Sequence, residues 1–348
     1  MDHIRILKRA FAVTTSYRAL WIFGILLALT TSGRSGGSSG GGGNGSGTGS
    51  GPGILTPQLT PDMVTGLIVA GIVLLVVALL LTAVFIVLRY VSETALIRMV
   101  DQHEATGEKL TVRQGFRLGW SRAALRLFGL DLLVGLTVFL GFVLAALVAA
   151  APLLVWFTES TPAHVLGTVV TIALGIVVIF ALIVISLVIS LVQQYWHRAV
   201  VLEGHGIRAA LRRGWQLLRR RLGDNIIMGL IVFGLGLAWA IVLIPVVFLL
   251  LAVAAITGGL PALLVYAIAG LVAQGATPWI AAVIVGLPIF IAVLALPLLI
   301  LGGLMETFTT TTWTLTYREL LALEAAAPAA GPTEPPMTPA APSLPEPV

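Results

Sequence analysis

Five long apolar runs constrain what this chain can fold into more than any other feature of its sequence. The shortest has 26 residues, whereas a helix that rises about 1.5 Å per residue crosses a bilayer with roughly 20. Only 10% of the 348 residues are charged, far fewer than a soluble surface of this size needs. The sequence therefore predicts an all-α membrane protein. The five runs cover residues 63–88, 127–157, 165–192, 226–256 and 279–305.

A sixth apolar run, residues 19–31, has only 13 residues, and the basic residues decide whether it crosses the membrane. If it crosses, 19 of the 20 lysines and arginines lie on one side, as the positive-inside rule requires. We therefore predict six transmembrane helices with both termini cytoplasmic, the first helix being lengthened by residues 10–17. Another short run, 259–275, is expected to form a half-helix or a surface helix between the last two spans.

The segments that lead into alternate spans resemble one another. Residues 112–120 read VRQGFRLGW and residues 207–215 read IRAALRRGW, which places two arginines and a Gly-Trp pair in register. Residues 7–24 match the first segment less closely. These similarities predict three parallel two-helix repeats within a membrane domain of residues 1–320, each preceded by a cytoplasmic amphipathic helix. The repeats cover about residues 3–90, 110–198 and 207–320.

A stretch rich in glycine and serine, residues 32–53, follows the first span, and 12 of its last 21 residues are glycine. Its matches to nucleophile-elbow and dinucleotide-binding patterns lack the neighbouring strand and helix that those sites need. We expect a disordered external link here and a disordered cytoplasmic tail over residues 326–348. Residues 93–109 are rich in charge and predict a solvated cytoplasmic turn.

The amphipathic lead-in helices carry the first candidate site. On a helical projection of residues 207–222, apolar side chains gather on one face and arginines on its flank, which is typical of a helix in the membrane interface. Topology anchoring and contact with anionic lipid head groups are the simplest roles for such a surface. A specific site for a head group or for another membrane protein is the alternative. The lipid- or partner-binding candidates are Arg113, Arg117, Trp120, Arg208, Arg212, Trp215 and Arg219.

Two acidic residues, Asp131 and Glu306, lie within or beside the spans and form the second candidate site. An ionisable group in a membrane indicates function by default. Both residues, however, are close to the expected cytoplasmic interface, where a loop arginine such as Arg126 can pair with them. A polar path for transport is the alternative. The threonines at 309–312 are expected to bond to carbonyls of their own helix.

Residue types leave little room for other chemistry. The chain has no cysteine, which excludes disulfides and thiolate sites. Its five histidines lack metal-ligand spacing and are expected to be solvated or interfacial. No set of nucleophile, base and orienting residue is evident, and the basic residues are too few for nucleic-acid binding. We therefore expect no cofactor, no metal and no enzymatic activity.

The turn Leu202-Glu203-Gly204, the following ALRRGW (210–215) and the ending WTLTYREL (313–320) carry a resemblance. They are similar to a broad bacterial family of six-helix membrane proteins of unknown function, related to the membrane domain attached to some glycerophosphoryl diester phosphodiesterases. The resemblance implies a six-helix fold without a mechanism, since no catalytic domain accompanies it here. The sequence thus predicts a multi-pass protein of the cell membrane that acts as a scaffold or binds lipids or partners. Transport through a path near Asp131 and Glu306 is the alternative.

Overall fold

The computed structural model describes residues 2–35, 61–157, 161–272, 275 and 277–326, which are helical almost throughout and include no strand. The expected tail after residue 326 and most of the glycine-rich link lie outside these ranges, but residues 32–35 belong to a helix. The elements are α1 (His3–Ser16), α2 (Ala19–Ser35), α3 (Pro61–Thr106), α4 (Val112–Gly119), α5 (Arg122–Ala150), the 3₁₀ helix η1 (Ala151–Phe157), α6 (Thr161–Leu202), α7 (Ile207–Arg220), α8 (Leu222–Val272) and α9 (Thr277–Ala326).

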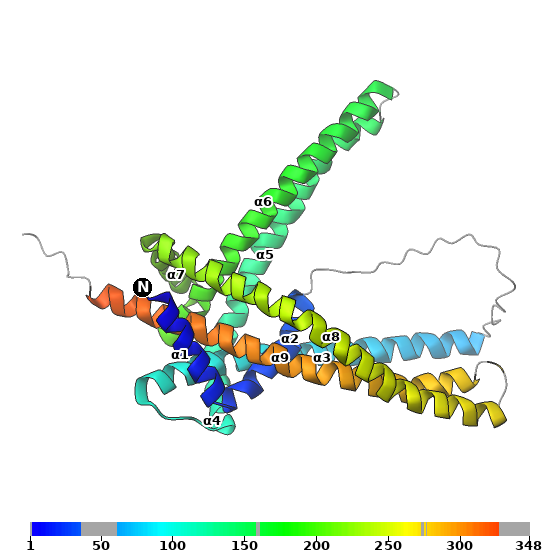
Figure 1. Ribbon diagram of the computed structural model, residues 1–348. Helices are drawn as coiled ribbons and strands as arrows, with labels where there is room; N and C mark the ends of the chain where they lie inside the picture. Colours follow the sequence, from blue (N-terminus) through cyan, green and yellow to red (C-terminus); the bar gives the residue numbers. More distant parts are fainter. Residues whose placement is uncertain (1, 36–60, 158–160, 273–274, 276, 327–348) are drawn as a thin grey trace, which may run out of the picture.

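The long helices extend as arms from a common base (Figure 1). α5 and α6 lie side by side as one arm, while α8 and α9 form a second arm that leaves the base in another direction. α3 forms the third and packs against the shorter α2. The base is completed by the short amphipathic helices, because α1 packs on α9, α4 on α3 and α7 on α6.

Five helices, α3, α5, α6, α8 and α9, are long and apolar enough to cross a membrane, and a sixth crossing results if α1 and α2 count as one bent span. The chain turns by 99° between α1 and α2, so residues 10–17 do not continue the first span as a straight helix. Hydrogen bonds hold this corner. The indole of Trp21 donates to the Thr14 carbonyl over 2.6 Å, and the Tyr17 hydroxyl donates to the Leu110 carbonyl over 2.8 Å.

The arms bury almost none of their apolar surface inside the protein. In the most apolar 18 residues of α3 and of α6, no residue is buried inside the protein. In the corresponding stretches of α5, α8 and α9, only 6% of the residues are buried. Apolar surface in water costs about 25 cal/mol per Å², so side chains such as Leu74 and Phe180 need a hydrocarbon environment. The architecture is that of a multi-pass membrane protein.

The expectation of a separate half-helix at residues 259–275 is wrong, because α8 continues without a break from Leu222 to Val272. Pro245 and Pro261 lie inside it. Near Pro261 the helix packs closely on α9, since a Cβ on Gly258 would lie 2.9 Å from the Gly286 carbonyl oxygen. Small residues at such a crossing let two backbones approach and compensate for a lost helical hydrogen bond.

The expectation of a solvated turn over residues 93–109 is also wrong. α3 continues to Thr106, and its side chains at Leu96, Ile97 and Val100 are completely buried in the base. At about 69 Å, a 46-residue helix is more than twice as long as a hydrocarbon core is thick, so its last turns extend beyond the span. Only residues 107–111 leave the helix, and Gly107 supplies the positive φ of 74° that this turn requires.

Two adjacent glycines in α9 make a matched test of the contact between α2 and α9. A Cβ on Gly303 would lie 2.6 Å from the backbone nitrogen of Ile25, whereas a Cβ on Gly302 would meet only the Ala28 methyl at 3.7 Å. Gly303→Ala is therefore expected to destabilise the protein by about 1–3 kcal/mol. Gly302→Ala is expected to be neutral or stabilising, since alanine favours helix. Thermal unfolding of the detergent-solubilised variants measures both, and equal melting temperatures would contradict the packing.

Candidate functional site

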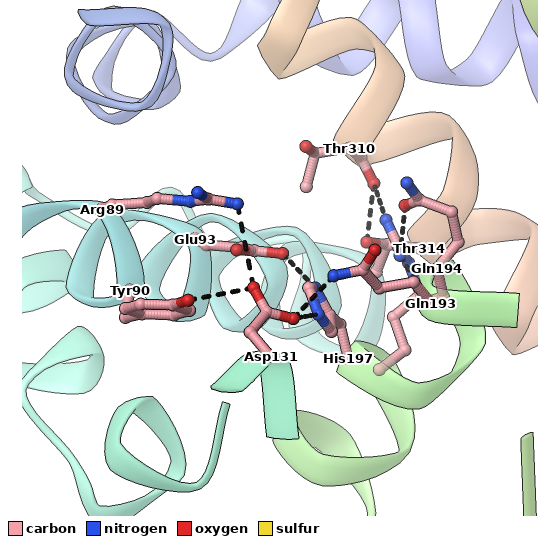
Figure 2. Close-up of polar contacts among 10 residues, drawn as sticks. Arg89, Tyr90, Glu93, Asp131, Gln193, Gln194, His197, Thr310 and Thr314 are labelled. Carbon is pink, nitrogen blue, oxygen red and sulfur yellow. Dashed lines mark hydrogen bonds and ion pairs between the residues drawn. The ribbon is translucent and has the colours of Figure 1, made fainter. Parts of the chain in front are cut away.

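A histidine held between two carboxylates lies in the base (Figure 2). His197 Nδ1 is 2.5 Å from Glu93 Oε1, and its Nε2 is 2.8 Å from Asp131 Oδ1. The three residues come from α6, α3 and α5, and each side chain is at least 86% buried. Both ring nitrogens face oxygen atoms that only accept hydrogen bonds, so the arrangement fits an imidazolium that donates to both.

Asp131 is surrounded by further donors. Gln193 Nε2 donates to it over 2.6 Å and the Tyr90 hydroxyl over 3.0 Å, while Arg89 Nη2 lies 3.8 Å away (Figure 2). Its basic neighbours are thus His197 and Arg89 at the ends of two spans. Arg126, five residues before Asp131, instead donates to the Gly204 carbonyl over 2.8 Å. The side chain is fixed by contacts with α3 and α6.

The structure places Glu306, the other predicted acidic site residue, close to this cluster but not in it. Glu306 is partly buried in α9 and interacts electrostatically with Glu93 and Arg89. Within the described residues its carboxylate forms no hydrogen bond or ion pair. The expected bonding of the threonines at 309–312 to their own helix is confirmed for Thr312, which donates to Phe308 O over 2.8 Å, whereas the buried Thr311 hydroxyl has no hydrogen-bond partner among the described residues.

A buried arginine joins α6 to α9 beside the carboxylate–histidine cluster. Arg198 is 2% exposed, and its guanidinium donates to the Gln194 carbonyl over 2.6 Å and to the Thr310 carbonyl over 3.1 Å. A buried charge is costly unless hydrogen bonds replace its hydration. Arg198 therefore fixes the position of α9 relative to α6.

A second group of charges closes the base around Glu203, in the turn after α6. Glu203 accepts a hydrogen bond from the Tyr317 hydroxyl and lies 3.5 Å from Arg213 Nε. Arg213 also donates two hydrogen bonds to Glu324, the shorter of 2.6 Å, and this bonding raises the pKa of the Arg213 guanidinium. These residues belong to the three sequence segments that carried the resemblance or follow them directly. Their contacts explain why the segments occur together.

The arginine–tryptophan surface consists of the seven lipid- or partner-binding candidates, which lie on α4 and α7 or directly after α4. The five arginines are exposed, and so are Trp120 (73%) and Trp215 (46%). Among the described residues none of these arginines forms an ion pair with a carboxylate. The apolar face of α7 is less available than the projection indicated, because Leu218 is buried and Gly214 packs on Trp196 of α6.

An apolar cavity opens beside Trp120, between α3 and α5. Its volume is about 690 Å³, and Tyr90 and Phe128, whose rings stack edge to face at 5.6 Å, lie in its wall. A smaller cavity of about 370 Å³ lies between α3 and α4 and also contacts Trp120. Trp120 thus lines both apolar hollows.

Sequence reasoning missed two members of the buried cluster, Glu93 and His197. Glu93 was assigned to a solvated turn, and the expectation of a solvated or interfacial histidine is wrong for His197, which is 6% exposed. A signal was present in the spacing. Each of Glu93, Asp131 and His197 lies within five residues of the base end of an apolar run, so helices that meet there bring the three together.

The fold and these sites define the class: a helical protein with five or six potential membrane spans and a polar base. The chain belongs to a family of unknown function, DUF7544, which matches residues 7–328. No curated protein and no solved structure matches the chain. The matched residues include every candidate site residue named above. In the described part of the chain, no group of three or more histidine, aspartate or glutamate side chains could hold a metal ion.

Removing the central histidine should expose the energetic role of the cluster. His197→Ala leaves Glu93 and Asp131 buried without their shared cation, and we expect a loss of about 3–5 kcal/mol in stability. A neutral triple variant, Glu93→Gln, Asp131→Asn, His197→Gln, leaves no buried charge without a partner. It is therefore expected to be more stable than His197→Ala. Thermal unfolding followed by circular dichroism compares the three proteins. A His197→Ala variant that melts like the parent would show that the cluster does not join the helices.

Proposed function

We propose that this protein is a non-enzymatic, multi-pass protein of the cell membrane that binds anionic lipid head groups, or partners with similar charge, through its arginine–tryptophan surface. The observation that carries the proposal is the absence of carboxylate partners for five exposed arginines in the described chain. Arginine donates up to five hydrogen bonds in a planar arrangement that suits phosphate. Exposed tryptophans beside them are typical of the membrane interface.

The proposal includes three parallel repeats with the base and both termini on the cytoplasmic side. Two contacts support the repeats. α4 packs on the end of α3 through Gly119, and α7 packs on the end of α6 through Gly214, the residue that matches Gly119 in sequence. The distribution of lysine and arginine supports the orientation. The relation to the membrane domain of glycerophosphoryl diester phosphodiesterases is likewise proposed from the shared motifs alone.

Electrostatic attraction sets the size of the expected preference for anionic lipid. Each arginine near an anionic leaflet contributes about 1 kcal/mol, and salt screens that contribution. Three arginines on α7 therefore favour an anionic over a zwitterionic lipid neighbour by a few kcal/mol at most, which is enough for a measurable enrichment.

The test replaces Arg208, Arg212 and Arg219 together by glutamine in the full-length protein reconstituted in mixed bilayers. We expect the preference for spin-labelled phosphatidylglycerol over phosphatidylcholine to fall by up to about 100-fold, because about 1 kcal/mol for each of three charges sums to about 3 kcal/mol before screening by salt. Lysine at the same positions keeps the charge and is expected to keep most of the preference. An unchanged preference in the glutamine variant across a salt series would refute lipid binding by this surface.

Transport through a polar path is a second candidate, and the position of Glu306 is the observation that favours it. Its carboxylate lies beside Glu93 and Arg89 without a hydrogen bond among the described residues, as a group that exchanges ions would. Asp131 is held by several donors, so Glu306→Gln is the more informative change. We expect ion or proton flux in proteoliposomes to fall if a path passes Glu306. Equal flux for parent and variant would remove this candidate.

A further inference from the structure

The cavity between α3 and α5 combines an apolar interior with a polar edge. Its α3 wall consists of Ala83, Ile86, Val87, Tyr90 and Val91, and its α5 wall includes Leu125 and Phe128. Several of these side chains are substantially exposed, with Leu125 at 72%, and both walls belong to helices that could cross a membrane. An apolar hollow of about 690 Å³ in such a place is of the size that encloses a small ligand or part of a larger one.

The edge of the cavity is formed by Trp120, Ser121 and Arg122, where the chain passes from α4 to α5. Arg122 is exposed and has no carboxylate within ion-pair distance in the described chain. The hydroxyl of Ser121 is buried without a hydrogen-bond partner, although this residue occupies the N-cap position of α5. The first backbone N–H groups of a helix lack intrahelical acceptors, and here no side chain caps them.

We propose that this cavity is a binding site for one anionic membrane phospholipid, with an acyl chain between α3 and α5 and the phosphate at Arg122, Ser121 and the first turn of α5. The inference rests on the proposed function and names the site at which lipid binding is specific. Charge complementarity selects the occupant: the edge offers a cation, an unused hydroxyl and backbone donors, while the interior offers only apolar side chains and the Tyr90 ring. A phospholipid supplies both counterparts in one molecule.

The unpartnered hydroxyl of Ser121 beside an apolar cavity distinguishes this site from the general surface of α4 and α7. An exposed arginine attracts any anionic head group, whereas Ser121 lies at the edge of the cavity with a hydroxyl that has no hydrogen-bond partner in the described chain. Binding the acyl chain and the phosphate at the same time also slows exchange of the lipid, because both contacts must be broken together. The site therefore predicts one slowly exchanging lipid per chain.

The experiment uses the full-length protein purified in detergent, with phosphatidylglycerol and phosphatidylcholine of identical acyl chains as probes and native mass spectrometry as the readout. Ala83→Trp places a large side chain in the cavity, and we expect it to abolish the tightly bound lipid. Ala78→Trp, on the exposed surface of α3 outside the cavity lining, is the matched control and is expected to retain it. Arg122→Gln should weaken phosphatidylglycerol binding roughly tenfold while Arg122→Lys restores part of it.

Failure of this proposal and failure of the proposed function give different results. If glutamine variants on α7 lose their lipid preference but Ala83→Trp and Arg122→Gln bind phosphatidylglycerol like the parent, the surface binds lipid and the cavity proposal is overturned. If no variant loses the preference for phosphatidylglycerol, both the cavity proposal and the proposed function are overturned. A change from one oligomeric state to another in Ala83→Trp, with lipid binding intact, would identify a second copy of the chain as the occupant and also overturns the proposal. Arg122→Gln tests the site independently if Ala83→Trp fails to fold.

Discussion

The salt-bridged contact of His197 with Glu93 and Asp131 is the interaction on which the arrangement of the arms depends. It joins α3, α5 and α6 at the base, beyond which α3 diverges from the arm formed by α5 and α6 (Figure 1). Apolar surface alone does not specify such a junction, because helices in lipid gain nothing from hiding apolar side chains from a solvent that is itself apolar. Directional hydrogen bonds between charged groups do specify it, and the adjacent contact of Arg198 with Thr310 brings α9 into the same arrangement.

The arms and the base of the protein are thus suited to different environments, hydrocarbon for the arms and water for the base. The apolar side chains of the arms are exposed on the protein surface and suit a hydrocarbon environment. The base instead contains a packed core in which Tyr195 contacts Trp313 and Tyr317. Helices such as α3 and α9 pass through both environments without interruption. The short amphipathic helices cover the base, and α4 and α7 expose the arginine and tryptophan side chains of the proposed lipid-binding surface.

Much of the fold could be predicted from the sequence, because run length and apolar composition determine which helices can cross a membrane. The lengths of the helices could not. The charges at Glu93, Asp101 and Glu104 indicated a solvated turn, yet they lie on the last part of α3, where Leu96, Ile97 and Val100 are buried. Residues 259–275 were expected to form a half-helix or a surface helix, yet α8 continues through Pro261 while packed on α9. Asp131 was identified from its place in a span, but its partner His197 required knowledge of which helix ends meet.

The continuity of the long helices has a mechanical consequence. A 51-residue helix such as α8 is about 76 Å long, and rigid rotation about one end carries the other through an arc proportional to that length. A tilt of about 5° at the base would therefore move the far end of α8 by roughly 6–7 Å, more than one helical turn. Side-chain rearrangements of ångström size among the charges of the base would thus be magnified several-fold at the opposite face of the membrane.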